Sequence, residues 1–241
     1  FFKPRLLISA PYGVTSVERR AVVEAGLGAG GREVNIIPQP LAAALGVDLP
    51  IGTPTGNMII CLGAGTSQAA VISMSSIVSA ETIRVAGLKL DEAIINYVRK
   101  KYGLIIGQPT AEQLKLNIGA ASPVQEEKTM EIQAQDQVSG LPKPASLTTN
   151  EIVEALQPPL EEIVASIRRV LEKTPPELIS DIIDRGVALC GGTSLLKGLD
   201  KYLTVALGIP AYVVENPVTC TVEGAAKGFS ILEVLLRSQG R

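Results

Sequence analysis

Two glycine-rich turns are the strongest candidates for chemistry in this chain. Gly63–Thr66 separates two apolar stretches, and Gly191–Thr193 follows a third. Glycine lets backbone N–H groups approach an anion closely, so turns of this kind often bind phosphate. We expect the second turn to open a helix, whose N-terminus would also favour an anion. Neither turn matches a Walker A loop or a dinucleotide-binding fingerprint, and each could be an ordinary tight turn.

The residue types exclude several other kinds of site. The chain has no His among its 241 residues, which excludes Ser–His and Cys–His catalysis and His-ligated metals. The chain has three cysteines, Cys61, Cys190 and Cys220, which are widely spaced and lie in apolar stretches. Their odd number and their positions indicate buried, reduced thiols of a cytoplasmic protein. The net charge is −2 with no long basic run, so nucleic acid is not an expected partner. No apolar stretch approaches the ~20 residues that span a bilayer.

The elements around the turns are those of an α/β protein with mixed sheets. With 46% apolar residues, the chain can form one large domain or two small ones. A strand, a helix capped by Thr15 and Glu18, a second strand and a helix opening at Pro40 predict parallel strands covered by helices. Three short strands with short connections then predict antiparallel neighbours. The expected strands cover residues 6–10, 34–37, 58–62, 69–74, 77–84 and 211–214, and one more strand directly precedes the second glycine-rich turn.

The second half of the chain is expected to be mainly helical. An apolar stripe at helical spacing marks a helix ending at Gly103, and a short helix follows from Thr110. Residues 121–148 are polar and predict exposed loops with one small hairpin. A helix from Asn150 should be broken or restarted by Pro158–Pro159. Further helices are expected at 175–183, after the second glycine-rich turn and near 222–236.

The order of these motifs resembles the MreB family, the bacterial actin homologues of the actin, heat-shock chaperone and sugar-kinase superfamily. The resemblance runs along essentially the whole chain and matches roughly the last two thirds of a typical MreB, so we expect the N-terminal third to be missing. The segments that carry it are SAPYGVTSVERRAV, PLAAALG, GAGTSQAAVIS, AGLKLDEAIINYVRKKYG, TAEQLKLNIG, TPPELISDIIDRGVALCGGTSLLKGLD and NPVTC.

The resemblance implies an actin-like fold, with two α/β domains around a nucleotide cleft. Residues 1–50 would be the remainder of the first domain, and a C-terminal helix at 219–241 would pack back on it. Residues 51–218 would form the second domain, with a small subdomain at about 110–175. The first domain would then be incomplete, and we expect the isolated chain to be weakly stable or to self-associate.

The family's second phosphate loop normally reads Asp-x-Gly-Gly-Gly-Thr. This chain keeps Gly63, Gly65 and Thr66, but has Ala64 for a glycine and Cys61 for the aspartate. That aspartate normally helps to hold the Mg²⁺ shell, a task for oxygen ligands that a neutral thiol cannot perform, so no residue is expected to bind the metal directly. The other nucleotide contacts that the resemblance implies are Gly87, Glu112, Lys115, Gly191, Gly192 and Thr193.

Three further positions depart from the family pattern. Leu88 replaces an aspartate, and Pro38–Gln39 replaces a glutamate pair that positions or activates the attacking water. Gln39 is a weak candidate for the catalytic residue, since it can orient a water but cannot take its proton. Thr193 stands where a third glycine is usual, and its β-branched side chain should resist a positive φ.

The resemblance implies ATP or ADP with Mg²⁺ as the ligand, and the replaced residues imply weak or absent hydrolysis. Exchanging Cys61 for Asp together with Gln39 for Glu should then raise hydrolysis. The implied function is a filament-forming cytoskeletal protein of rod cell shape and cell-wall synthesis; the alternative is a degenerate, non-hydrolysing scaffold. A sugar kinase or chaperone lacks support, because the chain has no room for a chaperone's substrate domain.

The resemblance also implies partners and a location. The partners would be further copies of the chain, membrane proteins of cell shape and cell-wall synthesis, and the membrane surface. Filaments would lie in the cytoplasm at the inner face of the cell membrane. Phe1–Phe2, beside Lys3 and Arg5, would suit anionic lipid, although an apolar end cut from its context explains them equally well.

Overall fold

A five-stranded mixed sheet forms the centre of the molecule, in the order β10-β9-β3-β4-β5. The computed structural model describes residues 3–232, so Phe1–Phe2 and the last part of the expected C-terminal helix, residues 233–241, lie outside the described residues. Strands β3, β4 and β5 are antiparallel neighbours, as predicted, while β9 runs parallel to β3 and β10 parallel to β9. The five strands are β3 (Asn57–Leu62), β4 (Ser67–Ser73), β5 (Ser76–Ile83), β9 (Val187–Cys190) and β10 (Ala211–Val213).

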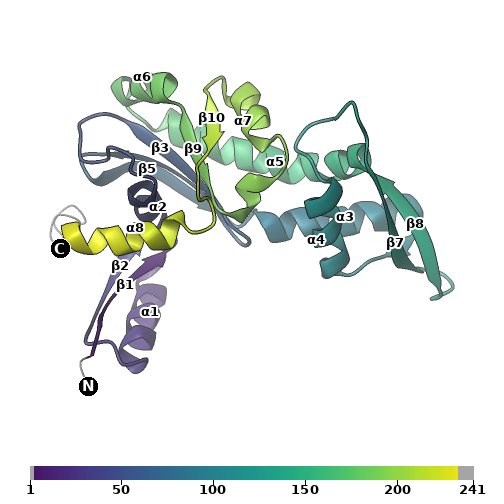
Figure 1. Cartoon of the computed structure of the whole chain (residues 1–241), viewed down its shortest axis with the longest axis horizontal. Helices are drawn as coiled ribbons and strands as arrows, with labels where there is room; N and C mark the ends of the chain where they lie inside the picture. The colour runs from purple at the N-terminus through teal and green to yellow at the C-terminus, as the bar shows by residue number, and fades with distance from the viewer. Residues whose placement is uncertain (1–2, 233–241) are drawn as a thin grey trace.

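Two smaller sheets lie at opposite ends of an elongated molecule (Figure 1). The first is the predicted parallel pair β1 (Arg5–Ala10) and β2 (Glu33–Pro38), which carries helix α1 (Ser16–Gly28). The predicted capping box begins α1, because the Thr15 side chain and the Glu18 carboxylate bond each other's backbone N–H. The other sheet holds β6 (Leu104–Ile105), β7 (Thr129–Asp136) and β8 (Pro142–Thr148), and its β7–β8 hairpin is the small hairpin predicted within residues 121–148.

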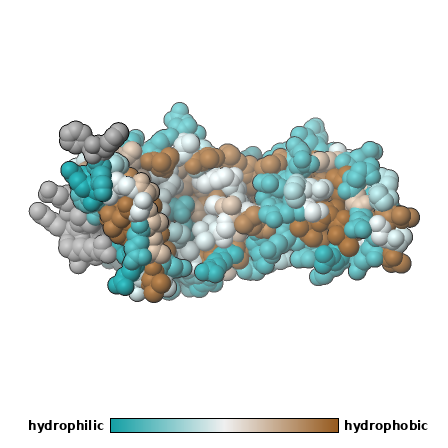
Figure 2. Space-filling view, turned by 90° about the horizontal axis from the view of Figure 1, so that it is seen from below, coloured by the Kyte–Doolittle hydropathy of each residue, from teal (hydrophilic) through white to brown (hydrophobic). Residues whose placement is uncertain are grey.

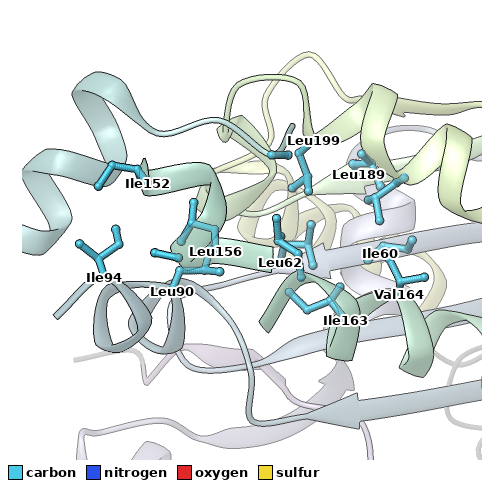
Figure 3. Packing of buried hydrophobic residues seen from close by; sticks show 14 of the residues in the cluster. Ile60, Leu62, Leu90, Ile94, Ile152, Leu156, Ile163, Val164, Leu189 and Leu199 are labelled. Carbon is cyan, nitrogen blue, oxygen red and sulfur yellow. The ribbon is translucent and has the colours of Figure 1, made fainter. Parts of the chain in front are cut away.

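Helices cover both faces of the central sheet. On one face, α3 and α5 enclose the larger core, in which Leu62, Leu90, Leu156 and Ile163 meet (Figure 3). On the other, α2 and α8 pack against each other over a smaller core that includes all three cysteines. The helices are α2 (Gln39–Gly46), α3 (Gly87–Tyr102), α4 (Gln108–Ile118), α5 (Thr149–Glu172), α6 (Pro176–Arg185), α7 (Leu199–Leu207) and α8 (Cys220–Gly228), with short 3-10 helices at Gly192–Leu195 (η1) and Phe229–Ile231 (η2).

Two sequence-based expectations about helices are wrong. Helix α5 runs without a break through Pro158 and Pro159. Its apolar stripe is buried on both sides of the prolines, with Leu156 and Leu160 at most 1% exposed, so packing against the core outweighs a local cost of about 3 kcal/mol for a proline. The second glycine-rich turn opens the four-residue 3-10 helix η1 instead of an α-helix, and α7 begins only at Leu199.

Apolar side chains are also exposed at several places along the molecule (Figure 2). Among residues 3–232 the most exposed large apolar side chain is Val138, at the tip of the β7–β8 hairpin, with 97% of its surface accessible.

Candidate functional site

The two glycine-rich turns lie side by side, although about 130 residues separate them in the sequence. Strands β3 and β9 are parallel neighbours, and Cys61 lies opposite Cys190 in their register. The two turns that follow these strands therefore leave the sheet side by side, at the C-terminal ends of the strands. The hydroxyl of Thr193 donates a hydrogen bond of 2.8 Å to the carbonyl of Gly63, which joins one turn directly to the other.

A cavity of about 210 Å³ opens between these turns and the N-terminal end of α3. It brings together most of the residues that the sequence singled out. The wall opposite the turns comes from α4, whose predicted residues Glu112 and Lys115 face the cavity one helical turn apart. The lining residues are Gly63, Ala64, Gly87, Leu88, Asp91, Glu112, Lys115, Leu116, Gly192 and Thr193.

The backbone explains why Gly191 and Gly87 are glycines. Gly191 has a φ of +89°, and a Cβ there would lie 2.2 Å from the carbonyl oxygen of Leu62. At Gly87, a Cβ would lie 2.9 Å from Thr193 Oγ1. Gly192 differs, since a Cβ there would meet no atom within 4 Å, so the chain leaves open space beside this residue.

Thr193 does not behave as its residue type predicts. It lies in η1 and is absent from the residues with positive φ among the described part of the chain, so it is not strained. The positive φ falls on Gly191 instead, two residues earlier. The side chain of Thr193 fills the gap between the turns and fixes them together through its bond to Gly63.

Lys115 is held by an acidic residue that the sequence analysis did not select. Its ammonium lies 2.7 Å from Asp91 Oδ1 and donates to the carbonyl of Gly87 at 3.0 Å. Asp91 is only 2% exposed, and the contact is an ion pair with no well-aligned hydrogen bond to Oδ1 from residues 3–232. Burial raises the pKa of Asp91, while Lys115 opposes that shift. The signal in the sequence is that Asp91 shares a helix face with Ile94, Ile95 and Val98.

Cys61 lies in the core and does not line the cavity. It is 1% exposed, and its Sγ lies 3.2 Å from the Sγ of Cys190, which is fully buried. Cys220 at the start of α8 belongs to the same core, and the neighbouring Cys190 thiol and burial raise the pKa of its thiol. All three are free thiols, which agrees with the prediction of reduced cysteines.

Four of the predicted site residues do not line the cavity. Gly65 and Gly191 belong to the turns but are not part of the cavity lining, and Thr66 lines a separate cavity beside Tyr12. Gln39 lies at the start of α2, where its Oε1 accepts a hydrogen bond of 2.6 Å from the buried Gln68. Gln68 was not predicted; its signal is a polar side chain on the same strand face as the buried Ala70 and Ile72.

A larger cavity of about 500 Å³ lies between the loop after β1 and the β4–β5 turn, but it contains neither glycine-rich turn. We therefore take the smaller cavity as the candidate site, because the glycine-rich turns and the polar residues selected from the sequence meet there, and this is a better criterion than volume.

The donor set fits part of a nucleotide but not a magnesium ion. The open glycine backbone at Gly192 and the α4 wall suit a nucleoside and a phosphate oxygen. Two carboxylates line the cavity, Glu112 and Asp91, but Asp91 is paired with Lys115, and no carboxylate stands at position 61 to hold a metal shell. Within residues 3–232, no three His, Cys, Asp or Glu side chains form a group that could hold a metal ion.

Comparison with known proteins gives a consistent result. The family model described as MreB/Mbl protein matches residues 1–236. The chain is 46% identical to the cell shape-determining protein MreB of Escherichia coli over 231 residues, which is 96% of this chain and 67% of that protein. It is 43% identical to the cell shape-determining protein Mbl of Bacillus subtilis, over 93% of this chain and 67% of that protein.

Solved structures also match this chain. The crystal structure of MreB5 of Spiroplasma citri bound to ADP matches with a TM-score of 0.92 and 35% identity, covering 97% of this chain and 71% of that one. A structure of the MamK double helical filament matches with a TM-score of 0.76 at 18% identity, which is a likeness of fold only. No helix within residues 3–232 is long and apolar enough to cross a membrane.

Proposed function

The chain belongs to the MreB/Mbl family and has the actin-like fold, and from this premise we propose that it is a nucleotide-binding, filament-forming protein of cell shape. It spans about two thirds of the length of its curated relatives, so the activity of a whole protein is part of this proposal. The relatives' names supply the cell-shape role, and the structures of MreB5 with ADP and with AMPPNP supply the ligand class.

One observation carries the nucleotide proposal. Residues from four separate segments, at Gly63, Gly87, Lys115 and Gly192, line a single cavity. The turns would contact phosphate oxygens through backbone N–H groups, and Glu112 and Lys115 on α4 would contact the ribose or base. Lys115 reaches such a ligand with its charge already balanced by Asp91, so it would act mainly as a directional donor.

Within this function, we propose that hydrolysis is weak or absent. When bound, Mg²⁺ would neutralise phosphate charge, but residue 61 cannot help to hold it, because its side chain is a buried thiol in contact with Cys190. Leu88, which is 45% exposed, places an apolar side chain at the cavity. The protein would then bind nucleotide and assemble as a scaffold, the second of the two functions that the sequence allows.

We further propose that the filaments lie in the cytoplasm along the inner face of the cell membrane, with membrane proteins of cell-wall synthesis as partners. The names of the MreB and Mbl relatives support a role in cell shape. Sedimentation of the chain with ADP, with AMPPNP and without nucleotide tests assembly, and flotation with anionic vesicles tests membrane contact.

Nucleotide binding is tested by titrating ADP into the wild-type chain and into Gly192→Val. The new side chain would fill the open space beside Gly192 without a backbone clash, so ADP affinity should fall at least tenfold. Gly28→Val is the matched control, because Gly28 lies at the far end of α1 and a Cβ there also meets no atom within 4 Å. Equal ADP affinities for wild type and Gly192→Val would show that the cavity is not the nucleotide site.

A further inference from the structure

Asp91 is a buried carboxylate that lines the candidate cavity and has few partners of its own. Its side chain lies on α3 and is only 2% exposed. Its one ion-pair partner among residues 3–232 is Lys115, whose Nζ lies 2.7 Å from Oδ1 without a well-aligned hydrogen bond. A carboxylate has about four acceptor sites, and buried charges are normally both paired and hydrogen-bonded. Asp91 therefore lacks hydrogen-bond donors.

The second oxygen of Asp91 faces the cavity. Oδ1 is the only buried side-chain nitrogen or oxygen without a hydrogen bond in the described part of the chain. No residue in this range donates a hydrogen bond to Oδ2 either, yet Oδ2 does not belong to the buried atoms, so it keeps accessible surface. Because Asp91 lines the candidate cavity, a donor group of a bound ligand can reach Oδ2 there.

The surrounding backbone holds the Asp91–Lys115 pair in place. The start of α3 is fixed to the first glycine-rich turn, because the N–H of Gly87 donates to the carbonyl of Gly63 at 3.2 Å. Lys115 ties α4 to the same point, because its ammonium donates to the carbonyl of Gly87 at 3.0 Å. The carboxylate and the ammonium therefore stand side by side before any ligand binds, as recognition of a defined group requires.

An acceptor beside a donor suits a hydroxyl group. An ammonium has three N–H donors, and the contacts with Asp91 and Gly87 use two of them, so Lys115 keeps one at the cavity. A phosphate oxygen only accepts hydrogen bonds and would be repelled by the charge of Asp91, whereas an amino group only donates. A hydroxyl donates and accepts, and in a nucleotide the hydroxyls belong to the ribose.

We propose that Asp91 is a specificity-determining residue, whose Oδ2 accepts a hydrogen bond from a ribose hydroxyl while Lys115 donates to the oxygen of the same hydroxyl. The site then selects ribonucleotides over deoxyribonucleotides. Glu112, the other carboxylate at the cavity, is exposed and has no ion pair among residues 3–232, so it would lose more side-chain freedom in the same contact. The inference deepens the proposed function and rests on it for the ligand being a nucleotide.

Calorimetric titration of the wild-type chain with ADP, 2′-deoxy-ADP and 3′-deoxy-ADP tests the selection. The analogue that lacks the contacted hydroxyl should bind at least about tenfold more weakly than ADP, because a hydrogen bond to a charged group is lost and the buried carboxylate stays unpaired. Equal affinities for all three ligands would overturn the inference and leave the proposed function intact. A chain that binds none of them would refute the proposed function, and the inference with it.

Asp91→Asn tests whether Asp91 is responsible. The amide oxygen can still face Lys115, but the NH₂ group then faces the cavity and cannot accept from a hydroxyl. The preference for ADP should therefore disappear, whereas Asp184→Asn, which removes the same charge at an exposed position of α6, should keep it. A purely structural role for Asp91 would weaken ADP and its analogues alike, and an unchanged ratio would overturn the inference.

Glu112→Gln decides between the two carboxylates, and it does so even if Asp91→Asn does not fold. Its ratio of affinities for ADP and the weaker analogue should stay close to that of wild type. Loss of the preference in Glu112→Gln would assign the ribose hydroxyl to Glu112 and overturn the role of Asp91.

Discussion

At the scale of single residues, the surroundings of Cys61 decide what an acidic residue could do at the end of β3. The thiol lies in a core with Cys190 and Cys220, and no cation among residues 3–232 forms an ion pair there. Cys61→Asp with Gln39→Glu was expected to raise hydrolysis. The position of Cys61 argues against this, because the introduced carboxylate would have to leave the core to reach a metal.

Cys61→Asp should strongly destabilise the chain. A buried carboxylate without a partner costs about 3–5 kcal/mol, while the hydroxyl of Cys61→Ser should cost about 1–3 kcal/mol. Urea unfolding of the three proteins at pH 7 gives the comparison. Wild-type stability in Cys61→Asp would show that the new side chain leaves the core, and would support a restored metal site.

The buried Asp91 should make stability depend on pH. Its folded-state pKa is raised by burial, so its contribution is fully present below the ordinary aspartate value and is lost as pH rises through the folded pKa. The unfolding free energy of wild type minus that of Asp91→Asn should therefore fall as pH rises through this window. Urea titrations between pH 3.5 and 6 measure the difference, and a rise with pH would show that Lys115 outweighs burial.

Residue types alone predict part of the candidate site. The glycines of both turns, Glu112 and Lys115 can be selected because glycine spacing and helical spacing are local patterns. Asp91 and Gln68 could be suspected as polar side chains on apolar faces, but their partners, Lys115 and Tyr12, come from distant segments. The contact of the Cys61 side chain with Cys190 in the core depends on the register of β3 with β9, which cannot be read from any local sequence pattern.

At the scale of elements, α5 shows how packing overrides local preference. Proline cannot donate to the carbonyl four residues earlier and disfavours a helix, so the sequence predicts a break at Pro158–Pro159. The capping box of Thr148 and Glu151 begins the helix well before the prolines, and the buried stripe continues beyond them. The strands other than the two-residue β6, and most helices, follow local periodicity and were predicted. The short helix η1 was not predicted, because Thr193 bonds across to Gly63.

Pro158→Ala should stabilise the chain. Pro158 is exposed, so alanine removes no packing, while it restores an N–H that can bond to the carbonyl of Glu154. The gain should be up to about 3 kcal/mol, measured by urea unfolding. Glu162→Ala, at an exposed position of the same helix, is the control and should change stability by no more than about 0.5 kcal/mol. A loss of stability in Pro158→Ala would mean that the prolines set a bend the core requires.

At the scale of the whole molecule, burial is unequal from end to end. Every residue of β3 and β4 is buried, whereas most of β1 and β2 is only partly buried, and their sheet has two strands within the described residues. Two-stranded sheets are only marginally stable unless something packs on them. Here α8 contacts β1 and packs on α2, which ties this end of the molecule to the central sheet.

Backbone amides of β1 should therefore exchange with deuterium faster than those of β3. Local opening of a small, half-buried unit requires less free energy than opening of the central sheet. Mass spectrometry of peptides covering 5–10 and 57–62 compares the two strands directly. Equal protection would show that the two ends of the molecule open as one cooperative unit.

The burial of all three thiols has a practical consequence for spectroscopy. Because Cys61, Cys190 and Cys220 are inaccessible, the chain should react with maleimide only slowly while it remains folded. A single cysteine introduced at Val138, on the hairpin tip, would then be the one readily labelled position. A fluorophore or spin label there would report on distances and assembly without removal of any native cysteine.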